Sequence, residues 1–207
     1  GMDNQGLGVT IRTITRLVAR VFSYATVMLY IPANVATDID KIPTHSFKRG
    51  HRAAILEPDR IGHLLVDIDC LPGCLSVRYA LKIMPYVFLR SRELRGATWD
   101  EIDLDRAIWT VPADHMKRKR EHVVPLARQV VALFRELHAA YPQTDIVFPS
   151  PRASAVPITD EALLAGLRHM GYTKDEMCVH GFRSIASTHL NEMGFRPDVI
   201  EAQLAHV

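Results

Sequence analysis

The chain has 207 residues, of which 48% are hydrophobic, and its 25 Lys and Arg against 23 Asp and Glu give a net charge of +2. This composition is too apolar and too evenly charged for an intrinsically disordered chain. No apolar run approaches the ~20 residues that a membrane-spanning helix needs, so we expect a water-soluble protein of one domain, or of one domain with a helical appendage. The small positive net charge permits nucleic-acid binding but does not indicate it. Whether a protein binds nucleic acid depends on where its charges lie on the surface.

The three cysteines, Cys70, Cys74 and Cys178, form neither an even set nor a CxxC pair. They predict reduced thiols in a cytoplasmic protein, and not a disulfide framework or a zinc site. The opening segment is polar and lacks the apolar centre of a secretory signal.

The first regular segment is predicted to be a long amphipathic helix over residues 8–31. Apolar residues recur with a 3.6-residue period from Ile11 to Leu29, and Pro32 ends the pattern. The opposite face carries a basic stripe formed by Arg12, Arg16 and Arg20. A stretch of linker-like composition follows at about 37–55, with the basic residues Lys41, Lys48, Arg49, His51 and Arg52.

The rest of the chain predicts further helices around a small sheet. Helical periodicity covers 58–68 and about 74–89. Residues 97–126 instead contain three short β-type runs, at 97–99, 108–111 and 122–125, which predict a small antiparallel meander. Helices return near 130–137, from the N-cap Thr159 to Gly171, and at 182–193 and 197–205. The expected fold class is therefore α+β, mainly α, with a three-stranded antiparallel sheet.

The sharpest local motif is His180-Gly-Phe-Arg183, at the start of a predicted helix. Side chains at i and i+3 share a helix face, so His180 and Arg183 can converge on one ligand. An imidazole beside a guanidinium suits a phosphodiester, because an arginine can hold two oxygens at once. Taken alone, the pair is more typical of hydrogen bonding at a helix start or of surface charge.

Three further segments carry candidate functional side chains. Arg90 and Glu93 lie where an apolar helix ends, a place where an arginine is usually explained by the helix dipole. The loop between the second and third strands fits either a solvated hairpin tip or a mobile lysine against a nucleic-acid backbone, and its cations are Lys117, Arg118, Lys119 and Arg120. His206 follows an apolar pair, where a histidine is more often buried or capping than a ligand.

Taken in chain order, these residues resemble the catalytic domain of the tyrosine recombinases, the phage and genomic-island integrases. The family pattern is an Arg followed by Glu-Leu, then W-x-E/D-I-D, a hairpin Lys ahead of H-x-VPL, HxxR, and L-x-H. The matching segments are Arg90 with Glu93-Leu94, Trp99-Asp-Glu-Ile-Asp103, Lys117 with His122-Val-Val-Pro-Leu126, His180-Gly-Phe-Arg183, and Leu204-Ala-His206. The resemblance covers about residues 51–207.

The resemblance also implies how the chain is divided. Residues 8–40 resemble the last helices of the core-binding domain that precedes the catalytic domain in the family. We therefore expect a partial core-binding helical segment at 1–40, a basic linker at 41–56, and a catalytic domain at 57–207 that is incomplete at its C-terminal end.

Each matched residue acquires a role from the resemblance. Arg90 and Arg183 would clamp the scissile phosphate and stabilise the charge that builds in the transition state, with Glu93 bracing Arg90. His180 would position the phosphate and manage the nucleophile's proton. Lys117 would protonate the leaving 5′-hydroxyl, and His206 would add a hydrogen bond to the phosphoryl oxygens. Since the guanidinium groups supply the electrostatic stabilisation, the resemblance implies no metal ion and no other cofactor.

The resemblance also implies the binding partners and the location of the protein. Double-stranded DNA is the expected partner, and other recombinase protomers are a second candidate. Neither a membrane nor a small-molecule substrate is expected. The expected location is the cytoplasm, with the nucleoid when DNA is bound. The basic residues expected to contact DNA are Arg12, Arg16, Arg20, Lys48, Arg49, Arg52, Arg118, Lys119 and Arg120.

One departure from the family pattern limits the expected activity. The family nucleophile is a tyrosine nine or ten residues past the L-x-H histidine, a spacing taken from the resemblance, whereas this sequence ends one residue past His206. The six tyrosines present lie upstream and do not fit that position: Tyr24, Tyr30, Tyr79, Tyr86, Tyr141 and Tyr172. We expect the chain not to cleave DNA alone. Three interpretations stay open: an integrase fragment, a DNA-binding module without catalysis, and a folded remnant without activity.

Overall fold

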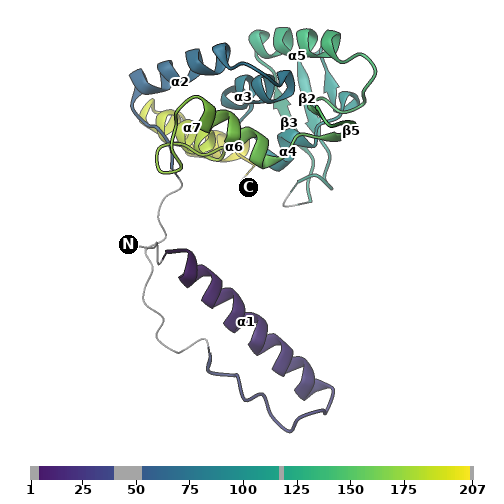
Figure 1. The fold of residues 1–207 in the computed structure, drawn as a ribbon, viewed down its shortest axis with the longest axis vertical. Coiled ribbons are helices and arrows are strands. Elements are labelled where there is room, and N and C mark those ends of the chain that lie inside the picture. Colours follow the sequence, from purple (N-terminus) through teal and green to yellow (C-terminus); the bar gives the residue numbers. More distant parts are fainter. Residues whose placement is uncertain (1–4, 40–52, 117–118, 206–207) are drawn as a thin grey trace. The chain divides into compact units, whose positions relative to one another are not determined.

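A computed structural model describes residues 5–39, 53–116 and 119–205. The chain divides into two compact units, residues 1–51 and residues 52–207 (Figure 1). Within the described ranges, no helix has both the length and the apolar character that crossing a membrane requires.

The smaller unit is built on α1 (Gln5–Val27), a helix of 23 residues. Leu29 takes a left-handed backbone conformation, with φ of 58°, so the helix stops earlier than the predicted limit at residue 31. The loop that follows folds back on α1, where the side-chain amide of Asn34 donates a hydrogen bond to the carbonyl of Ala19 at 3.2 Å.

The larger unit is organised around α3 (Leu75–Val87), which is apolar on most of its circumference and buries side chains from Val77 to Val87. A helix of this kind packs near the middle of a domain, and the narrow face that carries Arg78, Lys82 and Tyr86 stays partly exposed. It packs against α2 (Pro58–Cys70), α5 (Arg128–Ala140), α6 (Asp160–His169) and α7 (Gly181–Glu192). The position of α3 therefore determines the position of the next segment, which carries Arg90.

A three-stranded antiparallel sheet lies beside these helices, in the order β1 (Ile102–Asp103), β2 (Ile108–Val111) and β3 (His122–Pro125). In the β2–β3 register Trp109 faces Val124 and Val111 faces His122. Trp109, Val111 and Val124 are fully buried, which is the alternation that the sequence pattern predicted. The mainly helical unit with this small sheet confirms the predicted fold class.

Several local elements differ from the prediction. Residues 97–99 do not form the first strand, because Trp99–Glu101 is a short 3-10 helix and Thr98 makes only an isolated bridge to Ile146. A second sheet pairs β4 (Pro149–Ser150) with β5 (Ala153–Pro157), whose residues are mostly exposed and show no alternation. The five-residue helix α4 (Ser91–Arg95) is too short to produce a periodic pattern. The last helix, α8 (Pro197–Gln203), ends two residues before the predicted limit.

Candidate functional site

Arg90 is placed by the way in which α3 ends. Phe88 takes a left-handed backbone conformation with φ of 55°, and the next residue, Leu89, is buried. The chain thus turns sharply while its apolar side chains stay in the core. Arg90 then becomes the N-cap of α4, where its amide donates to Glu93 Oε2 at 2.9 Å and its guanidinium donates to Glu93 Oε1 at 2.8 Å. The two bonds fix both the backbone and the side chain of Arg90 to a buried carboxylate.

Arg183 lies in the first turn of α7 and is only 4% exposed. Its guanidinium donates hydrogen bonds to the carbonyl of Phe88 and, at 2.6 Å, to the carbonyl of Leu204. Burial, and secondly the charge of Arg90, lower the pKa of Arg183 to about 10. The side chain is therefore still protonated at neutral pH, and a charge is held inside the protein close to Arg90.

The two arginines meet at the end of α8. Arg90 donates a hydrogen bond to the carbonyl of Ala205 at 3.5 Å, and Arg183 donates to the adjacent carbonyl, that of Leu204. Carbonyl groups at the end of a helix stabilise cations, which offsets part of the repulsion between the two guanidinium groups. Glu93 is the buried counter-charge of Arg90, and the charge of Glu201 acts on Arg183 as well. Such a cluster is suited to an anionic ligand that offers several oxygens, as a phosphodiester does.

Gly181 accounts for the close packing of the His180-Gly-Phe-Arg183 segment. A Cβ atom at position 181 would lie 2.7 Å from the carbonyl oxygen of Ala53 and 2.8 Å from Met177 Sδ. Only a glycine lets the start of α7 lie this near the segment that precedes α2. His180 is the N-cap residue of α7 and is half-buried. The glycine thus sets the depth at which His180 and Arg183 lie.

His122, the first residue of β3, belongs to the same cluster and was not assigned a role from the sequence. Its Nε2 atom is buried and has no hydrogen-bond partner among the described residues. Burial lowers the pKa of His122; a hydrogen bond with the backbone of Gln203 and the charge of Glu93 raise it, whereas Arg183 and Arg90 lower it further. The imidazole therefore lies within the electrostatic reach of both arginines. The motif His122-Val-Val-Pro-Leu126 contains the residue, but the sequence pattern shows only a strand position.

The remaining predicted residues are placed less centrally. Arg16 and Arg20 are exposed on α1, in the smaller unit, and Lys119 and Arg120 are exposed between β2 and β3. Lys119 Nζ donates a hydrogen bond to the carbonyl of Asp114 at 3.1 Å. The side chain of Arg12 lies outside the described part of the structure, as do Lys48, Arg49, Arg52, Lys117, Arg118 and His206. The described residues contain no group of three or more His, Cys, Asp or Glu that could hold a metal ion.

Solved recombinase structures share this fold. The Tn1549 transposon integrase, in complex with a circular intermediate DNA, matches with a TM-score of 0.70 at 15% identity, over 93% of this chain and 69% of that one. A λ integrase dimer bound to a COC′ core site matches with a TM-score of 0.71 at 14% identity, over 97% of this chain and 57% of that one. The fold of the larger unit is thus that of a tyrosine recombinase catalytic domain.

The sequence defines the family. The profile of the phage integrase family matches residues 55–207, and the chain belongs to this family. The integrase of Enterobacteria phage P4 is 32% identical over 219 residues, covering 99% of this chain and 49% of that protein. Prophage integrase IntZ of Escherichia coli (strain K12) is 34% identical over 199 residues, covering 95% of this chain and 48% of that protein. The predicted resemblance is confirmed, and the chain spans about half the length of the curated relatives it matches.

Proposed function

We propose that the chain is the DNA-binding and phosphate-activating part of a site-specific DNA integrase. It binds duplex DNA by seating one backbone phosphate between Arg90 and Arg183. The single observation that carries this proposal is the convergence of the two guanidinium groups on adjacent carbonyls at the end of α8. Membership of the phage integrase family supports recombination as the process that the site serves.

Each residue at the site has its own role in the proposed reaction. Arg90 and Arg183 hold the non-bridging oxygens, and Glu93 keeps Arg90 oriented. His180, at the mouth of α7, positions the phosphate and exchanges the proton of the attacking group. Lys117 donates a proton to the leaving 5′-hydroxyl, and His206 adds a hydrogen bond to the phosphoryl oxygens. The roles of Lys117 and His206 follow from their places in the family pattern.

Cleavage by a tyrosine requires a phenol that can lose its proton at the phosphate. The Tyr79 hydroxyl donates a hydrogen bond to Glu136 at 2.8 Å, and the Tyr172 hydroxyl donates to Asp67 at 2.6 Å. The bond to Glu136 raises the pKa of Tyr79, while burial and Asp67 raise the pKa of Tyr172 to about 12. Neither phenol is prepared for attack. We propose that the chain by itself binds DNA without cutting it, and that it does so in the cytoplasm. Binding without cleavage is also what a non-catalytic DNA-binding module would show.

A salt titration of DNA binding tests the proposal. The chain should bind a labelled duplex at low salt, with log K falling linearly with log salt concentration. Arg90→Ala should weaken binding about 10-fold or more, since a charge-assisted phosphate contact is lost. Arg135 is a matched control, because it is an exposed arginine of α5 whose nearest ion-pair partner is Asp105 at 3.5 Å. Absence of binding at low salt, or equal effects of Arg90→Ala and Arg135→Ala, would refute the proposal.

Nicked suicide duplexes test the cleavage statement separately. Incubation with the chain should yield no covalent protein–DNA adduct, because Tyr79 and Tyr172 are engaged by carboxylates and none of the six tyrosines fits the family position of the nucleophile. An adduct resistant to denaturation would show that one of the present tyrosines reaches the phosphate.

A further inference from the structure

A buried carboxylate, Glu101, ties the root of the β2–β3 connection to the sheet. Glu101 is 7% exposed and ends the short 3-10 helix that precedes β1. Its Oε2 atom accepts a hydrogen bond from the indole of Trp109 at 2.9 Å, and its Oε1 atom accepts one from the Thr98 hydroxyl at 3.2 Å. His115 Nδ1 lies 3.1 Å from the same Oε1 atom. One carboxylate thus joins the 3-10 helix that precedes β1 to β2 and to the segment that follows β2.

The partners of Glu101 differ in how firmly they are held. Trp109 is fully buried in the middle of β2, so it fixes one carboxylate oxygen relative to the sheet. Burial raises the pKa of Glu101, while the indole of Trp109 and the charge of His115 lower it. The side chain of His115 is partly exposed, at 37%. The contact therefore links a partly exposed side chain to a carboxylate that the buried Trp109 holds in place.

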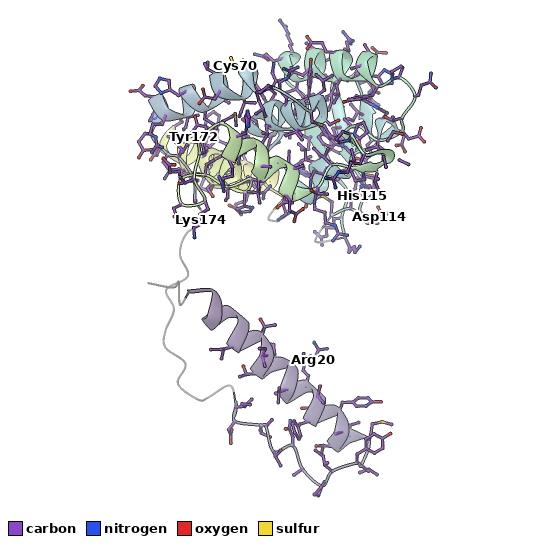
Figure 2. The ribbon with its side chains drawn as sticks, in the orientation of Figure 1. Arg20, Cys70, Asp114, His115, Tyr172 and Lys174 are labelled. Carbon is purple, nitrogen blue, oxygen red and sulfur yellow. The ribbon has the colours of Figure 1, made fainter. Side chains whose placement is uncertain are left out.

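The backbone around His115 is held as well. The amide of His115 donates to the carbonyl of Pro112 at 3.1 Å, and the amide of Met116 donates to that of Ala113 at 3.3 Å. Met116 is 4% exposed and belongs to the hydrophobic core. The segment is thus anchored by a core side chain and by the contact of His115 with Glu101. Asp114 and His115 lie at the opposite end of the larger unit from Tyr172 and Lys174 (Figure 2).

We propose that Glu101 and His115 are positioning residues for the cation that follows them, Lys117. They fix the root of the connection, so that the lysine is presented to the DNA phosphate held by Arg90 and Arg183. A lysine on a freely moving loop gives up much rotamer and loop entropy when it binds, and an anchored root reduces that loss. This inference rests on the proposed function, in which Lys117 contacts the phosphate.

A double-mutant cycle on DNA affinity tests the proposal. Lys117→Ala should weaken binding about 3- to 10-fold and lower the slope against log salt by about 1, as expected for one lost phosphate contact. His115→Ala should weaken binding about 2- to 5-fold, and Glu101→Gln similarly, because the lysine is no longer held in place. If His115 acts through Lys117, the double variant should bind within about 2-fold of Lys117→Ala. Losses that multiply would overturn the proposal, since His115 would then act by a contact of its own or through general stability.

Hydrogen exchange separates this proposal from the proposed function. In His115→Ala the amides of Met116 and Lys119 should exchange about 5- to 10-fold faster, while amides of α5 such as Val130 keep their rates. His169→Ala, at an exposed position of α6, is the matched control and should change neither. Unchanged exchange at Met116 overturns the anchoring even if the chain binds DNA. A wild-type chain that fails to bind at low salt overturns the DNA role, while the exchange rates still decide whether His115 anchors the segment.

Discussion

Glu93 accepts two hydrogen bonds from Arg90, one from its backbone amide to Oε2 at 2.9 Å and one from its guanidinium to Oε1 at 2.8 Å. The side chain of Glu93 is 2% exposed and that of Arg90 is 23% exposed. One carboxylate thus caps the first turn of α4 and orients the cation. In the proposed function, this pair links the stability of the chain to phosphate binding.

Replacement of Glu93 by Gln should affect both properties. The amide keeps the size of the side chain but leaves a largely buried guanidinium without its counter-charge, which should cost about 2 kcal/mol of unfolding free energy. Urea unfolding measures the change. Asp69→Asn is the matched control, because Asp69 pairs with Lys82 at 2.9 Å with 61% of its own side chain exposed. That variant should change the unfolding free energy by less than about 1 kcal/mol. Equal costs for the two would contradict the bracing role of Glu93.

The close approach at Gly181 predicts a contrast between two glycine-to-alanine changes. Gly181→Ala should destabilise the chain by about 1–3 kcal/mol, because the new methyl group meets backbone that cannot move away cheaply. Gly62, in α2, has open space around the position of a Cβ atom. Gly62→Ala should therefore be neutral or stabilise by up to about 1 kcal/mol, through helix propensity. Denaturant midpoints give both values, and a harmless Gly181→Ala would show that the packing around α7 is looser than described.

His122 predicts a dependence of stability on pH. Its pKa in the folded state lies below the ordinary value of 6.5, mainly because the imidazole is buried. Below that ordinary value the unfolded chain takes up the proton more readily than the folded one, so stability falls as the pH drops from 6.5 towards the lower folded-state pKa. His122→Gln should lose this contribution. Unfolding free energies between pH 4.5 and about 7.5 should converge for the two proteins at low pH, and parallel curves would contradict the assignment.

The sequence predicts secondary structure well where one face of a strand or helix is buried and the other is exposed. The β2–β3 hairpin follows from its alternation, since Trp109, Val111 and Val124 all face the core. The second sheet could not be predicted, because its strand Ala153–Pro157 is exposed along most of its length. The segment at Trp99 has strand-like residues, but its backbone coils into a 3-10 helix that leads into β1. Local propensity was overruled there by the tertiary arrangement.

The candidate site was predictable only in part. The order of the motifs pointed to Arg90 and Arg183, although nothing local to either residue shows that they meet. Their meeting depends on the left-handed turn at Phe88 and on the carbonyls that end α8. His122 was matched only as the first residue of the H-x-VPL motif and was given no role, because a histidine at the start of a strand is ordinary until its neighbours across the fold are known. Only the tertiary contacts show that His122 belongs to the candidate site.

The central claim is that Arg90 and Arg183 hold the same DNA phosphate, and a double-mutant cycle of these two residues tests it most directly. The cycle uses duplex affinity at low salt for the wild type, Arg90→Ala, Arg183→Lys and the double variant, with urea midpoints to confirm that each is folded. Two groups that share one ligand should give strongly non-additive losses, so the double variant should bind within about 2-fold of the weaker single variant. Losses that simply multiply would place the two arginines on separate contacts and contradict the account.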